Sequence, residues 1–222
     1  YLIEDNNEPI NFSVPTGNFG DVYAGYLAKK IGLPINKFIV ATNQNDILHR
    51  AISNGAYTVE NVSETISPSM DIQIASNFER LIYDLNNQSD EKTIEVMKSI
   101  KEKGKYLINK ENLEKINANF LSSRMDQADI LNTIKTVYEK FNIILDPHSA
   151  IGYGAFDKVN LKGNNIVLAT AHPCKFPDAI EKAINLKAEL PNELAFVLDE
   201  KENYDIIENN LNKIKQHIKE RI

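Results

Sequence analysis

A glycine-rich turn between an apolar strand pattern and a helix pattern constrains the fold of this 222-residue chain more than any other feature. Alternating apolar residues predict a strand at 10–14, the letters PTGNFG predict a tight turn, and apolar spacing predicts a helix over 22–31. A second strand is predicted at 38–41, after the helix-ending letters GLP. Two strands joined by a helix form a parallel pair, because a parallel pair needs a crossover connection. The turn then lies at the carboxyl edge of the sheet, where open α/β sheets bind ligands.

The segment that follows is predicted to be mainly helical. A helix capped by Asn43 or Asn45 is expected to end at Gly55, and proline is absent between Pro68 and Pro147. Apolar residues at helical spacing predict further helices in this segment. They form the sets Ile74, Phe78, Leu81, Ile82 and Leu85, then Ile94, Met97 and Ile100, then Leu113, Ile116 and Phe120, and last Ile130, Ile134, Val137, Tyr138 and Phe141.

Helices and strands alternate in the last third of the chain. A short helix is predicted over 151–156, strands are predicted at 166–169 and 194–198, and apolar residues over 207–218 predict an amphipathic helix. These patterns together predict an α/β fold in which helices flank a parallel-stranded sheet.

The expected organisation is one domain over 1–222, with residues 68–145 as a helical insertion. The first residue is Tyr1, and the chain soon enters the apolar run at 10–14, so we expect it to be part of a longer protein.

Composition limits the partners of the chain. With 25 Lys and Arg against 31 Asp and Glu, the net charge of −6 excludes nucleic-acid binding by bulk charge. No apolar run approaches the roughly 18 residues that a membrane-spanning helix needs, and the N-terminal letters are acidic, unlike a signal peptide. We therefore expect a cytoplasmic protein with no membrane partner. The single cysteine, Cys174, has no internal disulfide partner, and no Cys/His group has zinc-ligand spacing.

The PTGNFG turn is a candidate anion site. Gly17 and Gly20 are three residues apart, and backbone N–H groups of such a turn combine with the first N–H groups of the following helix to attract a phosphate. The letters fit neither a Walker A loop nor the dinucleotide fingerprint. The alternative is a plain strand-to-helix turn that uses glycine for its backbone angles.

Three ordered segments resemble one enzyme family. Residues 14–46, VPTGNFGDVYAGYLAKKIGLPINKFIVATNQND, resemble the phosphate-loop segment of the threonine synthase family, pyridoxal-phosphate (PLP) enzymes of the tryptophan-synthase-β fold type. The segments SPSMDIQIASNFERL at 67–81 and LDPHSAIGYGA with ATAHPCKFPDAIEKA within 145–183 follow in that family's order. The resemblance covers about half of the chain and implies part of the large domain of PLP fold type II.

The resemblance implies roles for individual residues. The loop formed by Gly17, Asn18, Phe19 and Gly20 would hold the PLP phosphate through main-chain N–H groups, and Thr170 of the TAHP motif would lie against the pyridine nitrogen. A neutral hydroxyl there would leave the ring nitrogen largely unprotonated. The alternative for Thr170 is an ordinary strand-end or helix-capping hydroxyl.

The resemblance also implies an activity that this chain performs only in part. The family converts O-phospho-L-homoserine and water to L-threonine and phosphate, and its Schiff-base lysine lies upstream of the matched segments. We therefore expect no catalytic lysine in this chain, no activity from it alone, and a partnership with the N-terminal part of the same protein. Two alternatives stay open: a phospho-lyase acting on related phospho-amino acids, and a non-catalytic phosphate-binding module.

Weaker candidates for substrate contact are Arg50, Arg80 and His148. Arg50 and Arg80 fall in or beside the resembling segments, and a substrate phosphate favours guanidinium donors. For both, the alternative is a surface salt bridge. His148 and His172 are expected either to face the ligand cleft or to be structural histidines at helix starts, and Cys174 is expected to be a buried small apolar residue.

Overall fold

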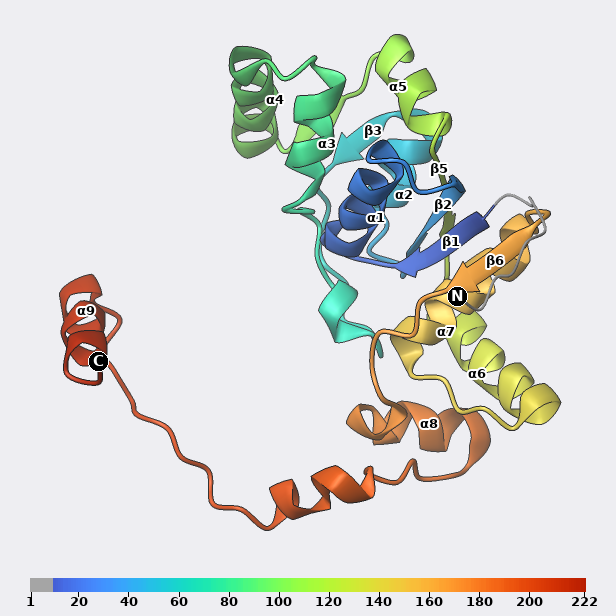
Figure 1. Cartoon of the computed structure of the whole chain (residues 1–222), viewed down its shortest axis with the longest axis vertical. Helices are drawn as coiled ribbons and strands as arrows, with labels where there is room; N and C mark the ends of the chain where they lie inside the picture. The colour runs from blue at the N-terminus through green and yellow to red at the C-terminus, as the bar shows by residue number, and fades with distance from the viewer. Residues whose placement is uncertain (1–9) are drawn as a thin grey trace. The chain divides into compact units, whose positions relative to one another are not determined.

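The computed structural model describes residues 10–222, and the chain divides into two compact units, Tyr1–Ala188 and Glu189–Ile222. This division differs from the single domain expected over 1–222. The larger unit contains the sheet and eight of the helices, which are visible in Figure 1. The smaller unit contains a 3-10 helix, η3 (Asn192–Leu198), and the helix α9 (Leu211–Lys219).

The main sheet has four parallel strands in the order β5-β2-β1-β6. These strands are β1 (Ile10–Pro15), β2 (Ile35–Thr42), β5 (Phe120–Arg124) and β6 (Asn164–Val167). Phe12 pairs with Phe38, and Phe38 pairs with Phe120, so three aromatic residues lie in one row across the sheet. The predicted α/β class with a parallel sheet is confirmed.

The strand–turn–helix–strand unit predicted from the glycine-rich turn is also confirmed. β1 leads through residues 16–19 into α1 (Gly20–Lys30), and α1 returns the chain to β2 beside β1. The turn therefore follows the carboxyl end of β1, at the sheet edge where ligands of α/β folds bind.

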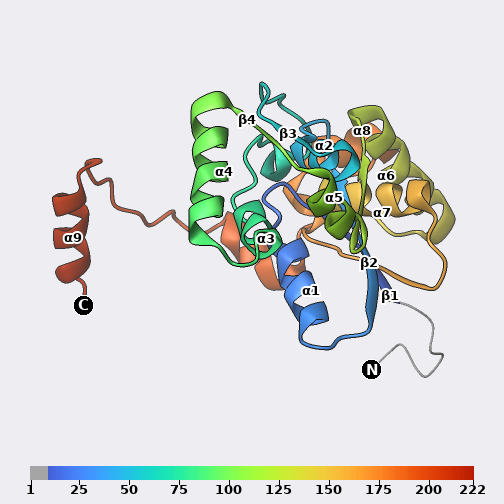
Figure 2. The same ribbon diagram turned by 90° about the horizontal axis from the view of Figure 1, so that it is seen from above.

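Helices cover both faces of the sheet. Alternate residues of β2 point to opposite faces, so each face has apolar side chains that need partners. Phe38 and Val40 belong to one apolar cluster, which also includes residues of α1 and of the helices α2 (Ile47–Asn54) and α3 (Phe78–Leu85). Ile39 and Ala41 belong to a second cluster on the other face. Its helices are α6 (Gln127–Phe141), α7 (Pro147–Val159) and α8 (Pro177–Ile184), which lie together in Figure 2.

The remaining elements of the larger unit complete its connections. They are β3 (Ala56–Thr58), which pairs antiparallel with β4 (Lys105–Leu107), the helices α4 (Asp90–Lys103) and α5 (Lys110–Asn117), and two 3-10 turns, η1 (Pro68–Met70) and η2 (Pro173–Lys175).

The segment 68–145 is not wholly helical, which corrects the expected insertion. Phe120, assigned to a helix by its spacing, lies in β5, the strand that extends the main sheet beyond β2. Its ring is fully buried against the sheet face. Phe120 lies at helical spacing from Leu113 and Ile116, but α5 ends before it and the chain then enters β5. Apolar spacing alone does not separate a short helix from the strand that follows it.

The strand predicted at 194–198 is wrong: these residues lie in η3. A strand needs a neighbour for its backbone N–H and C=O groups, and none pairs with this segment among residues 10–222. The side chains of Leu194 and Phe196 are exposed. The last helix is confirmed over its main part, but it begins at Leu211 and leaves Ile207 outside.

Two further helix boundaries differ from the expectation. Ile74 lies outside α3, which begins at Phe78. Neither Asn43 nor Asn45 caps α2, because the N-cap position is Asp46. The Asn43 and Asn45 side chains instead donate hydrogen bonds to the carboxylate of Asp71. Over residues 10–222, no helix is long and apolar enough to cross a membrane.

The close contact between α1 and the sheet gives a stability prediction. A Cβ atom at Gly25 would lie 2.7 Å from Cε1 of Phe38, which is buried and packs between Phe12 and Phe120. Overpacking costs about 1–3 kcal/mol, whereas replacing glycine inside a helix gains about 1 kcal/mol. We expect Gly25→Ala to lower the free energy of unfolding by about 1 kcal/mol, measured by urea unfolding. An unchanged or higher stability would show that helix propensity outweighs this contact.

Candidate functional site

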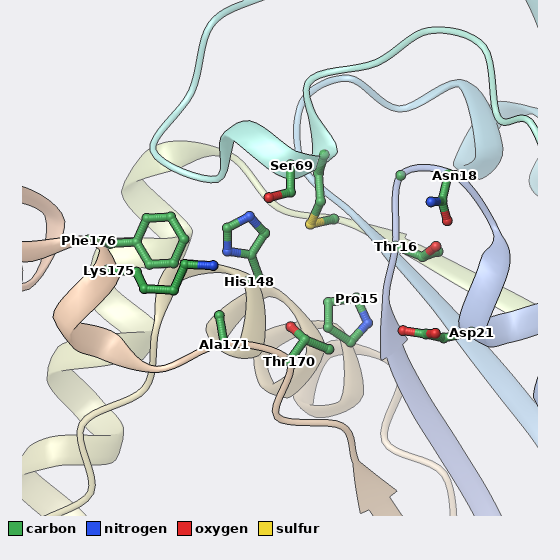
Figure 3. Close-up of a pocket in the computed structure, with 12 residues that line it drawn as sticks. Pro15, Thr16, Asn18, Asp21, Ser69, His148, Thr170, Ala171, Lys175 and Phe176 are labelled. Atoms are coloured by element: carbon green, nitrogen blue, oxygen red, sulfur yellow. The ribbon is translucent and has the colours of Figure 1, made fainter. Parts of the chain in front are cut away.

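A cavity of about 200 Å³ lies at the carboxyl edge of the main sheet (Figure 3). Its walls come from four parts of the chain: the end of β1 with the glycine-rich turn, η1, the start of α7, and the segment after β6. The lining residues are Pro15, Thr16, Gly17, Asn18, Asp21, Ser69, Met70, His148, Thr170, Ala171, Lys175 and Phe176. The parallel strands thus bring together residues that are about 150 positions apart in sequence, as the topology predicts.

Phe19 anchors the glycine-rich turn in the core. Its backbone is left-handed, with φ of 66°, and its side chain is fully buried. The ring contacts Phe78 and Phe120 at centroid distances of 5.2 and 5.6 Å. Its N–H donates to Oγ1 of the buried Thr16 at 3.0 Å. The left-handed backbone is unfavourable for a non-glycine residue by roughly 1–2 kcal/mol, and burial of the aromatic ring offsets this cost.

The turn approaches a neighbouring segment closely at Gly17. A Cβ atom there would lie 3.0 Å from Cα of Met70, so a side chain would push the turn away from η1. Glycine at this position lets the backbone form one wall of the cavity with η1 as its neighbour.

The N–H groups of the turn are only partly available to a ligand. The N–H of Phe19 is bonded to Thr16, and that of Gly20 donates to Oδ1 of Asn18 at 2.8 Å. Of the four residues expected to hold a phosphate through main-chain N–H groups, Phe19 and Gly20 therefore have N–H groups that are already bonded within the turn. Within residues 10–222, the N–H groups of Gly17 and Asn18 have no hydrogen-bond partner. They remain candidate donors to an anion, beside the positive end of α1.

Thr170 follows the end of β6 and lines the same cavity as the turn. The residue is exposed, and its backbone N–H donates to Oγ of Ser149 at 3.1 Å. The structure thus places Thr170 and the Gly17–Asn18 backbone on the same cavity, as expected from two parallel strands.

A buried carboxylate organises the start of α7. Asp146 is the N-cap of this helix and is 1% exposed; its two oxygens accept hydrogen bonds from the backbone N–H groups of His148 and Ser149. It also accepts from the Ser149 hydroxyl and bonds Nδ1 of His148 at 3.0 Å. Burial alone would raise the pKa of Asp146, but hydrogen bonds from His148 and Ser149 outweigh burial and lower it.

His148 faces the cavity with one ring nitrogen unoccupied. Its side chain is 6% exposed, and Nε2 is buried with no hydrogen-bond partner in the described part of the chain. The ring contacts that of Phe176 at a centroid distance of 4.8 Å. A buried polar atom without a partner is unfavourable, so this nitrogen is suited to bind a ligand group.

Lys175 and Phe176 extend the wall beside His148 (Figure 3). Lys175 is exposed, and its Nζ lies 5.9 Å from the centroid of the Phe176 ring. Its ammonium group has no ion pair with any residue that the structure describes. The sequence alone predicted no role for either residue.

The two candidate arginines are not at this cavity. Arg50 lies in α2, where it forms ion pairs with Asp46 at 2.8 Å and Glu60 at 3.1 Å. Arg80 lines a separate hollow between α1, α3 and α4. Arg50 thus forms salt bridges, which was the alternative expected for it. Of the three weaker candidates for substrate contact, only His148 lines this cavity.

Two other residues of the TAHPCK segment have local structural contacts. His172 is the N-cap of η2 and accepts a hydrogen bond from the N–H of Cys174 at 3.2 Å. Cys174 is a half-buried free thiol. Over residues 10–222, no group of three or more His, Cys, Asp or Glu side chains is placed to hold a metal ion.

Several cavity residues were missed from the sequence, and their signals differ. Asp146 does not line the cavity itself; it was expected to start a helix together with Pro147, which is the pattern of an N-cap followed by proline at the first helical position, but its hydrogen bonds to the His148 and Ser149 side chains were not predicted. Thr16 lies within the PTGNFG turn and Asp21 follows it directly, but the spacing of the glycines predicted no role for either. Ser69 and Lys175 lie inside the resembling segments, but no pattern singles them out there, because only the fold brings them to the cavity.

Replacing Asp146 tests its support of the cavity wall. We expect Asp146→Asn to lower the free energy of unfolding at pH 7 by about 1–3 kcal/mol, since buried donors lose a charged acceptor. The pKa of Asp146 is lowered by folding, so its stabilisation is present above the unfolded pKa of about 3.9 and is lost as pH falls through the folded pKa. The difference between parent and variant should therefore shrink in acid. Urea unfolding at several pH values measures it.

The exposed Asp157 at the end of the same helix provides the control. Asp157→Asn should change stability by less than about 0.5 kcal/mol. An Asp146 variant as stable as this control at pH 7 would contradict the structural role of the carboxylate.

An anion should bind at the turn. We expect density for phosphate or sulfate beside the N–H groups of Gly17 and Asn18 in crystals grown with either ion, because these unpaired N–H groups lie directly before the N-terminal end of α1. Crystal soaks with a heavier oxyanion such as selenate would locate it by anomalous scattering. Binding only elsewhere on the molecule would contradict the site.

Comparisons with known proteins agree in pointing to one family. The family model "Threonine synthase, C-terminal" matches residues 149–218. The threonine synthase of Pseudomonas aeruginosa is 40% identical over 212 residues, covering 94% of this chain and 45% of that protein. The threonine synthase of Saccharomyces cerevisiae is 41% identical over 199 residues, covering 81% of this chain and 39% of that protein. The chain thus spans less than half the length of these relatives.

Solved structures show the same relationship in three dimensions. The PLP-bound threonine synthase from Brucella melitensis superposes with a TM-score of 0.90 at 40% identity, covering 98% of this chain and 47% of that one. The yeast threonine synthase gives a TM-score of 0.84 at 37% identity, covering 96% of this chain and 47% of that one. With its sequence and its fold both matched over nearly its whole length, this chain belongs to the threonine synthase family.

Proposed function

We propose that the protein containing this chain is a PLP-dependent threonine synthase, which converts O-phospho-L-homoserine and water to L-threonine and phosphate. The observation that carries the proposal is the shared cavity of the glycine-rich turn and Thr170, in a chain that resembles a PLP-bound threonine synthase. The chain would supply part of the site, and the N-terminal part of the same protein would supply the Schiff-base lysine.

The residues of the cavity fit the cofactor. A phosphate group needs N–H donors, and those of Gly17 and Asn18 are unpaired beside the N-terminus of α1. The close approach of Gly17 to Met70 keeps side chains out of this wall. Across the cavity, the partnerless Nε2 of His148 is a buried polar atom that a polar ligand would satisfy.

Each wall of the cavity would have its own task. The backbone of Gly17 and Asn18 would bind the PLP phosphate, and the Thr170 hydroxyl would contact the pyridine nitrogen. PLP supplies an electron sink for negative charge that develops on the carbons of the bound amino acid. A neutral hydroxyl at the ring nitrogen, in place of a carboxylate, moderates that sink.

Two structural features hold these groups in position. Phe19 fixes the turn to the core, and Ser149 accepts the backbone N–H of Thr170 while it donates to the buried Asp146. Both walls therefore rest on buried side chains rather than on exposed loops. Such support is needed because small displacements of binding groups reduce catalysis strongly.

The full-length protein provides the direct test. Purified with PLP and supplied with O-phospho-L-homoserine, it should release phosphate and L-threonine in equal amounts, measured by phosphate assay and amino-acid analysis. Phosphate release with a ketoacid product and no threonine would favour the phospho-lyase alternative. Phosphate binding with no turnover and no bound PLP would favour the binding module.

Replacing Thr170 tests the ring contact. We expect Thr170→Val in the full-length protein to lower kcat roughly tenfold, the effect of losing about one hydrogen bond, while PLP retention changes less. The phosphate-binding backbone is untouched by this change. Retention is measured by the PLP absorbance that remains after dialysis, and kcat by threonine formation.

Thr170→Ser is the matched control, because it keeps the hydroxyl and removes only a methyl group. It should retain most of the parent kcat. Equal kcat values for the Val and Ser variants would show that the hydroxyl has no part in catalysis.

A further inference from the structure

A polar network outside the cavity lining joins the end of β2 to η1. Asn43 directly follows β2 and is 1% exposed, and its side-chain NH₂ group donates to Oγ of Ser67 at 2.9 Å and to Oδ1 of Asp71 at 2.7 Å. Its Oδ1 accepts the N–H of Asn45 at 2.8 Å, which fixes the orientation of the amide. Ser67 and Asp71 flank η1 on its two sides. One buried amide therefore holds both ends of this turn.

Asp71 is the common acceptor of this network. Its Oδ1 also accepts from the Asn45 side chain at 2.9 Å and from the Thr65 hydroxyl at 2.7 Å, and its Oδ2 accepts from the Thr65 backbone N–H at 2.7 Å. Hydrogen bonds to a carboxylate are charge-assisted and stronger than those between neutral groups. Asp71 is thus tied to the end of β2 through two asparagines and to its own segment through Thr65.

The segment that carries η1 depends on these hydrogen bonds for its direction. Residues 60–64 are exposed, and so are Pro68 and Ser69. Met70 is buried in the second apolar cluster, and Ile66 packs against that cluster. Apolar contacts are non-directional, whereas hydrogen bonds require a defined distance and angle. The network therefore orients η1, while Met70 anchors it to the core.

The position of η1 in turn fixes the glycine-rich turn. Ser69 and Met70 line the cavity (Figure 3), and a Cβ atom at Gly17 would lie 3.0 Å from Cα of Met70. The Gly17 backbone therefore rests directly against the backbone of η1. A shift of η1 would move or release the Gly17 peptide, whose N–H is one of the two candidate phosphate donors.

We infer that Asn43 and Asp71 are positioning residues, which hold η1 against Gly17 and so keep the N–H groups of Gly17 and Asn18 in place for the phosphate of the cofactor. Neither Asn43 nor Asp71 lines the cavity, so each acts through η1. The inference rests on the proposed function, since it takes PLP as the ligand. It extends the binding machinery from the cavity wall to the end of β2, where small displacements would reach the bound phosphate.

An exchange of the amide and the carboxylate tests the network in the full-length protein. Asp71→Asn puts a donor where an acceptor is needed, so we expect the dissociation constant of PLP to rise about tenfold, the effect of losing about one hydrogen bond. Asn43→Asp places two carboxylates against each other and should also weaken binding. The double variant Asn43→Asp/Asp71→Asn restores a donor and an acceptor at this contact, so its dissociation constant should return to within about threefold of the parent value.

The dissociation constants are measured by equilibrium dialysis of the apoprotein, at a temperature far enough below the unfolding midpoint that every sample is folded. Glu64→Gln is the matched control, because Glu64 is an exposed carboxylate of the same segment that does not line the cavity. It should bind PLP as the parent does. If circular dichroism shows that Asp71→Asn is unfolded, Thr65→Val replaces it, since this change removes one donor and leaves the carboxylate in place.

Hydrogen exchange at η1 gives a second readout that does not depend on PLP. The N–H groups of Met70 and Asp71 donate to the carbonyl groups of Ser67 and Pro68, so they are protected while η1 is ordered. Mass spectrometry of the apoprotein should show faster exchange over residues 65–73 in each single variant. The double variant and Glu64→Gln should exchange as the parent does.

The outcomes separate this inference from the proposed function. Weaker PLP binding by the folded single variants, with recovery in the double variant, would support the inference. A lower unfolding temperature with parent-like PLP binding would show a structural role alone and overturn it, as would a double variant that binds no better than the single ones. If the parent protein binds no PLP, the proposed function fails. Faster exchange at η1 that the double variant reverses would then still support the hold of Asn43 and Asp71 on η1, and unchanged exchange would overturn it.

Discussion

Phe19 connects the hydrophobic core to the candidate functional site. Its ring is enclosed by the core at Phe78 and Phe120, while its backbone turns the chain from β1 into α1. Burial of an aromatic ring contributes a few kcal/mol, which exceeds the cost of a left-handed backbone. The cavity-lining N–H groups of Gly17 and Asn18 are therefore held by packing on the far side of the turn. A turn held only by its own hydrogen bonds would lack this anchor.

The opposite wall depends on a different interaction, the buried carboxylate of Asp146. It gathers the start of α7, the His148 ring and the Ser149 hydroxyl, and through Ser149 it reaches the backbone of Thr170 beyond β6. A buried carboxylate is tolerated when all its hydrogen bonds are formed, whereas removing one hydrogen-bond partner lowers the stability of the fold. One wall is thus fixed by apolar packing and the other by a polar network, and both lie at the ends of parallel strands.

Sequence patterns predicted the parts of this structure that depend on local order. The turn, α1 and the parallel pair followed from apolar spacing and glycine positions, and Thr170 reached the cavity because strand ends share an edge. The errors have one physical source. Whether Phe120 and residues 194–198 form strands, and where α2 and α3 begin, depends on which segments lie beside them in the folded chain. Lys175 and Ser69 could not be found, because their place at the cavity exists only in the folded chain. Arg50 was a plausible anion ligand until Asp46 and Glu60 appeared beside it.

The two hydrogen bonds within the glycine-rich turn differ in their exposure to solvent. Oδ1 of Asn18 bonds the N–H of Gly20 at 2.8 Å, but both atoms are exposed. Because water can replace the Asn18 side chain at this N–H, breaking this hydrogen bond would cost little. The Phe19 N–H is different, because its acceptor Thr16 is buried and has no such freedom. The turn therefore keeps its shape through the buried Phe19 N–H, whereas the hydrogen bond of the Gly20 N–H is open to exchange with solvent.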